Sequence, residues 1–160
     1  MLDVELYARR KSRLGVGVKV ADEQKNHQKF YSNMKIELIE IKKLKPHEKT
    51  NLAHLKKLKK RVLIDKKIKN PVIIDRKSLT ILDGHHRVET IRLLGLNKIP
   101  AYLVNYNDRK IKVLPRKNIQ VSKELVLLRA KHGNKFPAKT TRHVIPKRPL
   151  GCNTPLEFLI

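Results

Sequence analysis

The sequence predicts a small α+β domain built around a mixed β-sheet. Three observations favour this fold class: short runs of branched apolar residues typical of strands, two such runs separated only by a turn, and helical patterns between the strands. The order strand, helix, hairpin, helix, strand gives a sheet with helices packed on it. With 160 residues, 40% of them hydrophobic, the chain is long enough for a single small domain with its own core.

The first half of this pattern contains one strand and one helix. Residues 35–44 (KIELIEIKKL) carry branched apolar side chains and predict a strand, which ends before Pro46. Residues 50–63 predict an amphipathic helix, with Thr50 as its N-cap. Its apolar face is defined by leucines that recur at every third position: Leu52, Leu55 and Leu58.

A hairpin and a second helix follow. Residues 71–75 (PVIID) and 79–83 (LTILD) predict two strands joined by a tight turn. Gly84 interrupts the pattern, and residues 85–94 then predict a helix that stops at Gly95.

The remaining elements are shorter or weaker. We expect a strand at 99–104 (IPAYLV) and a weaker one at 110–114. Ser122 is a suitable N-cap for a helix that runs to residue 132, before Gly133. From Asn134 onward the prolines predict loop structure.

The charge is strongly positive. Lys and Arg number 38 against 14 Asp and Glu, which gives +24 and indicates polyanionic partners: nucleic acid, nucleotide phosphates or acidic lipid. The densest run is 56–61 (KKLKKR), which fits either phosphate or nucleic-acid contact, or a solvated helix face. No apolar run of 18 residues, no secretory signal and only one cysteine appear, so we expect a cytoplasmic protein with no membrane partner.

The most informative stretch is ILDGHHR, residues 81–87. A strand ends at Asp83, Gly84 permits a tight turn, and the free N–H groups of the next helix point back into that turn. Arg87 adds a bidentate phosphate donor, and Asp83 adds an acceptor suited to Mg²⁺ or a substrate hydroxyl. Taken alone, Asp83 fits a plain helix cap equally well.

Two further polar clusters accompany this loop. Glu48, in PHE, follows directly after a strand, where catalytic residues are common, although exposed loop glutamates are common there too. Residues 139–143 (KTTRH) place two hydroxyls, a guanidinium and an imidazole side by side. They suit a small carboxylate or phosphate, or else belong to a basic tail.

Together, ILDGHHRVETIRLLG between PVIID and IPAYLV resembles the ParB/sulfiredoxin superfamily, and LKPHE and FPAKTTRHVIP narrow the resemblance to archaeal free serine kinases. The resemblance implies a ParB/sulfiredoxin-like mixed sheet and transfer of a phosphoryl group to L-serine, giving O-phospho-L-serine. It also implies three segments: an N-terminal extension (1–34), a ParB-like nucleotide-binding core (35–108) and a reduced C-terminal lobe with the TTRH segment (109–160).

The same resemblance implies roles for particular residues. Glu48 would be the general base, and Asp83 would be essential, lying between the substrate and Mg²⁺. Nucleotide phosphates would be held by Gly84, His85, His86 and Arg87. The acceptor serine would be held by Thr141, Arg142 and His143, with Arg142 on its carboxylate. Relatives carry a longer stretch before the TTRH segment, and either ATP or ADP remains open as the donor.

Three other functions compete with the kinase. A ParB-like DNA-binding module agrees with the positive charge, and nonspecific nucleic-acid contact through the basic surface is compatible with either function. Only one clear helix is predicted after residue 105, however, where such modules carry a helix-turn-helix. A sulfiredoxin-like reductase would need a cysteine at the position of His85. A nuclease would need a cluster of metal-binding carboxylates, which the sequence does not contain.

Overall fold

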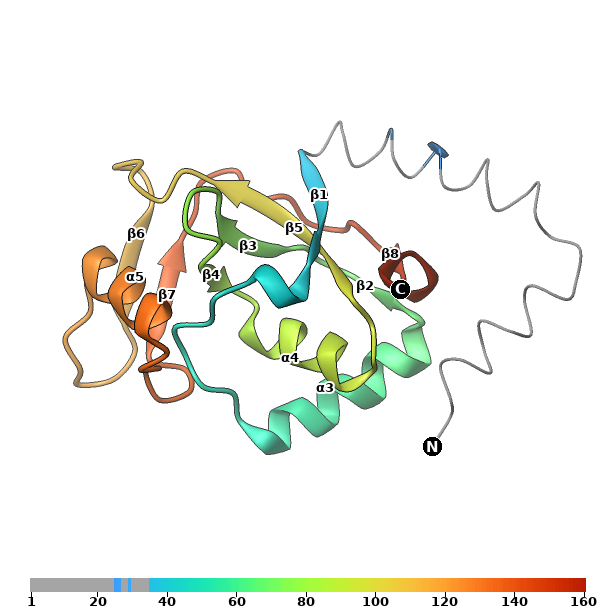
Figure 1. Ribbon diagram of the computed structural model, residues 1–160, viewed down its shortest axis with the longest axis horizontal. Coiled ribbons are helices and arrows are strands. Elements are labelled where there is room, and N and C mark those ends of the chain that lie inside the picture. The colour runs from blue at the N-terminus through green and yellow to red at the C-terminus, as the bar shows by residue number, and fades with distance from the viewer. Residues whose placement is uncertain (1–24, 27–28, 30–34) are drawn as a thin grey trace, which may run out of the picture.

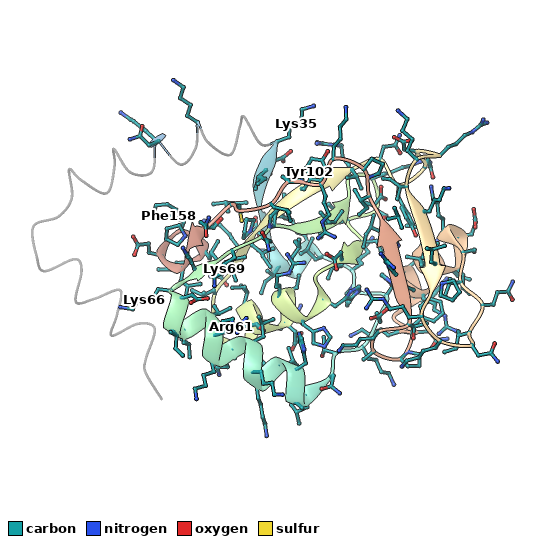
Figure 2. All side chains as sticks on the ribbon, turned by 180° about the vertical axis from the view of Figure 1, so that it is seen from behind. Lys35, Arg61, Lys66, Lys69, Tyr102 and Phe158 are labelled. Carbon is teal, nitrogen blue, oxygen red and sulfur yellow. The ribbon has the colours of Figure 1, made fainter. Side chains whose placement is uncertain are left out.

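The structure is a computed structural model, and it describes residues 25, 26, 29 and 35–160. Nearly all of the expected extension, 1–34, therefore lies outside the described residues. The chain forms a four-stranded sheet of order β1-β5-β3-β4 (Figure 1). Its strands are β1 (Ile36–Glu40), β3 (Val72–Asp75), β4 (Ile81–Asp83) and β5 (Lys98–Val104).

The sheet is mixed, as predicted. β5 pairs antiparallel with β1 and parallel with β3, and β3 and β4 form the expected antiparallel hairpin. The predicted strand 35–44 is wrong in its second half. The chain leaves β1 after Glu40 and turns through the 3-10 helix η1 (Ile41–Lys43), where the backbone N–H of Ile41 donates to Asn97 instead of continuing the ladder.

Two helices cover one face of this sheet: α3 (Leu52–Asp65) and α4 (His85–Leu93) (Figure 1). The N-cap of α3 is Asn51 and not Thr50, because the Asn51 side chain accepts a hydrogen bond from the backbone N–H of His54. Leu55 is buried, but Leu52 is 66% exposed. The predicted three-residue repeat was therefore wrong about Leu52, which lies in the first turn and extends beyond the edge of the core.

The alternation of side chains along β3 divides the core into two clusters. Val72 and Ile74 pack with Val88 and Ile91 of α4 on one face, as expected for residues two apart in a strand. Ile73, between them, points to the other face, where it packs with Val126 and Phe136. The sheet is therefore buried on both sides.

The second face is covered by the C-terminal third of the chain. The helix α5 (Lys123–His132) has the predicted caps, Ser122 and Gly133. The prediction of loop structure after Asn134 was wrong. β7 (Thr141–Val144) pairs antiparallel with β6 (Lys112–Pro115), and β8 (Thr154–Pro155) pairs with β2 (Lys67–Ile68) before the 3-10 helix η2 (Leu156–Leu159). Strands this short show little alternation between their prolines, so their pairing depends on tertiary contacts.

Candidate active site

Glu48 lies in the segment that connects η1 to α3, and this segment is fixed to Phe136. The N–H of Phe136 donates to the carbonyl of His47 at 2.8 Å, and the N–H of Lys49 donates to the carbonyl of Phe136 at 2.9 Å. Phe136 itself is fully buried. An apolar anchor thus brings the PHE segment beside the start of the KTTRH segment, although Glu48 and Lys139 are 91 residues apart.

The Glu48 carboxylate is surrounded by donors from residues 139–141. Oε1 accepts from the N–H of Lys139 at 2.6 Å, and Oε2 accepts from the N–H groups of Thr140 at 3.2 Å and Thr141 at 2.9 Å. The Thr141 hydroxyl also donates to Oε2 at 2.8 Å. Lys139 has a positive φ of 57°, and such a bend lets successive N–H groups converge on one anion. The structure therefore brings Glu48 and the TTRH segment together.

His47 contacts the same hydroxyl from the other side. Its Nδ1 lies 2.7 Å from the carbonyl oxygen of Ile81 and its Nε2 lies 3.0 Å from Oγ1 of Thr141. A carbonyl only accepts, so Nδ1 carries the proton and Nε2 of the neutral ring accepts. Burial lowers the pKa of His47, against the opposing effects of Glu48 and the Ile81 carbonyl. The Thr141 hydroxyl thus lies between two acceptors, a carboxylate and an imidazole, and its single proton can be donated to only one of them at a time.

Two more imidazoles surround His47. The ring of His85 lies 4.5 Å from that of His47 between centroids, and the ring of His143 lies 5.6 Å away. Burial, with a smaller contribution from His47, lowers the pKa of His143 to about 3 and that of His85 well below its ordinary value. Nε2 of His143 lies 2.8 Å from the Tyr106 hydroxyl. All three rings are therefore neutral near pH 7.

The DGHHR loop joins β4 to α4 as the sequence predicts. Gly84 is the N-cap of α4 and has a φ of 104°, and a Cβ there would lie 2.5 Å from Cγ1 of Val72. Only glycine suits both conditions. Asp83 is therefore the last residue of β4 and not the helix cap, and its carboxylate remains free to contact other groups.

Two arginines hold Asp83. Oδ2 accepts from Nη2 of Arg148 at 2.6 Å and from Nη2 of Arg87 at 3.0 Å. Burial raises the pKa of Asp83, but the two guanidinium groups outweigh it, so the pKa is lower than usual. Nη1 of Arg87 donates to the carbonyls of Asn70 and Pro71. Arg87 thus uses three hydrogen bonds to fix Asp83 and the start of β3.

His86 and His85 face different neighbours. Nε2 of His86 accepts from the backbone N–H of Asn51 at 2.9 Å, and its ring lies 4.5 Å from that of His54. Nε2 of His85 accepts from the backbone N–H of His47 at 3.3 Å. The two histidines therefore tie α4 to the PHE segment and to the N-terminus of α3.

A cavity of about 300 Å³ brings several predicted residues together: Asp83, Thr141, Arg142 and His143. Arg142 is exposed at its rim. Four residues near this site were missed by the sequence reasoning: His47, Tyr106, Arg116 and Arg148. His47 lay next to Glu48 in the PHE motif, whereas nothing in the local sequence distinguishes Arg116 or Arg148 from the other bases. Both arginines line the cavity.

Asp83 is the candidate metal ligand of this site. Within the part of the chain that the structure describes, no group of three or more His, Cys, Asp or Glu side chains is placed to hold an ion. Mg²⁺ commonly takes one or two carboxylates and completes its shell with phosphates and water. Asp83 fits a role as a single protein ligand in such a shell.

No described helix is long and apolar enough to cross a membrane.

Comparison with known proteins identifies the family. The model of the ParB N-terminal domain matches residues 20–115, which is more than half of the chain. The chain belongs to the ParB N-terminal domain family. The matched region contains the PHE segment and the DGHHR loop, and the KTTRH segment follows it.

Curated relatives of this ParB-family chain carry two kinds of name. A "ParB-like protein" of Sulfolobus acidocaldarius is 38% identical over 82 residues, which are 51% of this chain and 41% of the relative. An "ATP-dependent L-serine kinase" of Staphylothermus marinus is 31% identical over 80 residues, which are 48% of this chain and 32% of the relative. The matches thus span less than half the length of these relatives.

Solved structures share the fold. Free serine kinase in complex with AMP has a TM-score of 0.72 at 17% identity, over 79% of this chain and 94% of that one. SbnI of Staphylococcus aureus, with a C-terminal truncation, has a TM-score of 0.69 at 14% identity, over 79% and 90%. At these identities the likeness shows the fold. At 79% of this chain, it covers more residues than the family match.

Proposed function

We propose that this ParB-family chain is a kinase that transfers a phosphoryl group from ATP or ADP to free L-serine, giving O-phospho-L-serine. The main support for this proposal is that residues 139–141 donate hydrogen bonds to Glu48. They do so next to a cavity that Asp83, Thr141 and Arg142 line. Three segments far apart in sequence thus meet at one place. The names of the archaeal kinase relatives support the same activity.

The 300 Å³ cavity suits a small zwitterion with a hydroxyl group. Arg142, assisted by Arg116, offers planar guanidinium groups for the carboxylate of serine. Asp83 is ionised and offers a carboxylate for the ammonium group. Thr141 and His143 would complete the acceptor site, His143 as a neutral ring held by Tyr106.

Glu48 is the proposed general base. Among the described residues only the N–H of Lys139 bonds Oε1, so this oxygen keeps a lone pair for the serine hydroxyl, whereas Oε2 accepts three donors. As the serine oxygen bonds to phosphorus and the bridging P–O bond of the donor breaks, the hydroxyl proton passes to Glu48. A loose transition state requires little deprotonation, so orientation is its main contribution.

The DGHHR loop is the proposed phosphate end of the site. The first N–H groups of α4 have no partner within the helix and favour an anion, and Gly84 lets a phosphate approach the backbone. His85, His86 and Arg87 would shape this loop through the contacts described above. Mg²⁺, held by Asp83 and the nucleotide phosphates, would neutralise developing charge.

A ParB-like DNA-binding module is the competing function. It is favoured by the net charge of +24 and by the name of the Sulfolobus relative. Binding of one duplex sequence that survives at physiological salt would support this competitor.

The kinase is tested with matched carboxylate variants. We expect Glu48→Gln and Asp83→Asn to lower turnover of L-serine by about 100-fold or more, the usual contribution of a positioned base or charge. Glu37→Gln, on the exposed face of β1, should stay near wild type. Circular dichroism checks that each variant folds. Near-normal turnover in both site variants would contradict the assignment.

A further inference from the structure

A second cavity, beside residues 138 and 139, is lined by lysines. Its volume is about 470 Å³, and Lys57 of α3, Lys117 and Lys139 all line it, together with His54 and Asn51. None of its lining residues is acidic. In the described part of the chain, no carboxylate forms an ion pair with Lys57 or Lys139. Lys117 is held in place, because its Nζ donates to the carbonyl of Ala138 at 2.6 Å.

This lysine pocket adjoins the proposed catalytic groups. The backbone N–H of Lys139 donates to Oε1 of Glu48, so one wall of the pocket also contacts the candidate base. Asn51, on another wall, donates its N–H to His86 of the DGHHR loop. Lys139 also lies close enough to His86 to contribute to lowering its pKa, after burial and His54. The pocket therefore lies next to the DGHHR loop.

The two cavities differ in the kind of positively charged side chain that lines them. The cavity beside Asp83 is lined by arginines, whose planar fork matches a carboxylate. The lysine pocket presents compact point charges from three separate segments, an arrangement that suits several successive phosphates. Arg87, by contrast, already makes three hydrogen bonds to protein oxygens. It is therefore poorly placed to be the main phosphate ligand.

We propose that Lys57, Lys117 and Lys139 bind the phosphate chain of the donor nucleotide, next to the DGHHR loop. This inference rests on the proposed kinase function and assigns the donor side of that site. The segment 139–141 then borders both substrates: Lys139 lines the phosphate side, Thr141 lines the serine side, and their N–H groups hold Glu48 where the two substrates would meet.

The test is a binding titration of the full chain with ATP, ADP, AMP and inorganic triphosphate. The pocket variant is Lys57→Gln with Lys139→Gln, and the control is Lys56→Gln with Lys60→Gln, which removes the same charge from exposed positions of α3 outside the pocket. A charge-assisted hydrogen bond is worth roughly tenfold in affinity. We therefore expect the pocket variant to bind ATP about 100-fold more weakly, and the control to change less than about threefold.

Each possible result of this titration either supports or overturns the proposal. A loss that grows from AMP to ADP to ATP, with competition by triphosphate, supports it. The proposal is overturned if the pocket and control variants bind ATP equally well, whether or not both have lost affinity. It is also overturned if triphosphate does not compete with ATP. Either result leaves the kinase function intact. Nucleotide binding with the expected variant pattern but no phosphoserine would instead overturn the kinase function alone. No binding of any nucleotide to the wild type overturns both.

Discussion

The two faces of the central sheet are built in different ways. On one face, α3 and α4 pack against apolar side chains of β3 and β5 in a continuous core. On the other, Phe136 and Val126 supply a smaller apolar cluster, and polar bonds to Glu48, His47 and Tyr106 join the C-terminal third to the sheet. The first face is thus held mainly by apolar packing, and the second depends more on polar contacts.

This difference shows where the fold tolerates change. Apolar packing is non-directional and adapts to new side chains of similar volume. A buried polar network fails when one partner is removed, because the remaining group loses its hydrogen bond. The candidate site forms where the C-terminal third meets the PHE segment and the DGHHR loop, and its geometry depends on a few directional contacts.

A substitution at Gly84 should have the largest effect on stability, and it acts on the face that α3 and α4 cover. Gly84→Ala would place a methyl group 2.5 Å from Cγ1 of Val72 at a φ of 104°. Backbone strain and overpacking together should lower the free energy of unfolding by about 3–5 kcal/mol. Gly95→Ala is the matched control, because its φ of 69° is strained but nothing lies within 4 Å, so about 1 kcal/mol is expected. Urea unfolding measures both. Equal losses would show that the close contact with Val72 does not matter.

A lower pH should have the next largest effect on stability, through three buried histidines of the candidate site. His47, His85 and His143 have lowered pKa values when folded, so the unfolded chain binds more protons below its ordinary histidine pKa of about 6.5. Stability should be greatest above pH 6.5 and fall as the pH decreases toward 3, by up to about 1.4 kcal/mol per pH unit for each histidine. The opposing charge of Glu48 reduces the effect for His47.

Unfolding in urea at pH 7.5, 6 and 5 tests this slope. His143→Phe should make the slope shallower because one buried imidazole is removed. His132→Gln, exposed at the end of α5, should leave the slope unchanged. Stability that stays constant from pH 7.5 to 5 would show that the three rings are not buried in the neutral form.

Sequence patterns predicted the first face well. The hairpin, α4 and the glycine turn before it follow from local signals: alternating branched residues, a turn, and a glycine between a strand and a helical repeat. α5 was predicted for the same reason, since Ser122 and Gly133 mark its ends. Such signals are local, so a single sequence contains them.

The second face was only partly predictable. Glu48, Asp83 and the TTRH segment were selected from motifs, and the structure places them around neighbouring sites. Nothing local indicated that Lys139 would adopt a positive φ, or that Arg148 would reach Asp83 across 65 residues. β7 was missed because four residues among prolines give no clear alternation. These features arise from long-range packing on Phe136 and the sheet.

The most direct measurement is phosphorus NMR of the wild-type chain incubated with Mg²⁺, L-serine, and ATP or ADP. We expect the resonance of O-phospho-L-serine to appear with at least one donor, at a rate that falls about 100-fold or more in Glu48→Gln and is abolished by EDTA. No phosphoserine with either donor, from protein whose fold is confirmed by circular dichroism, would contradict the proposed kinase function.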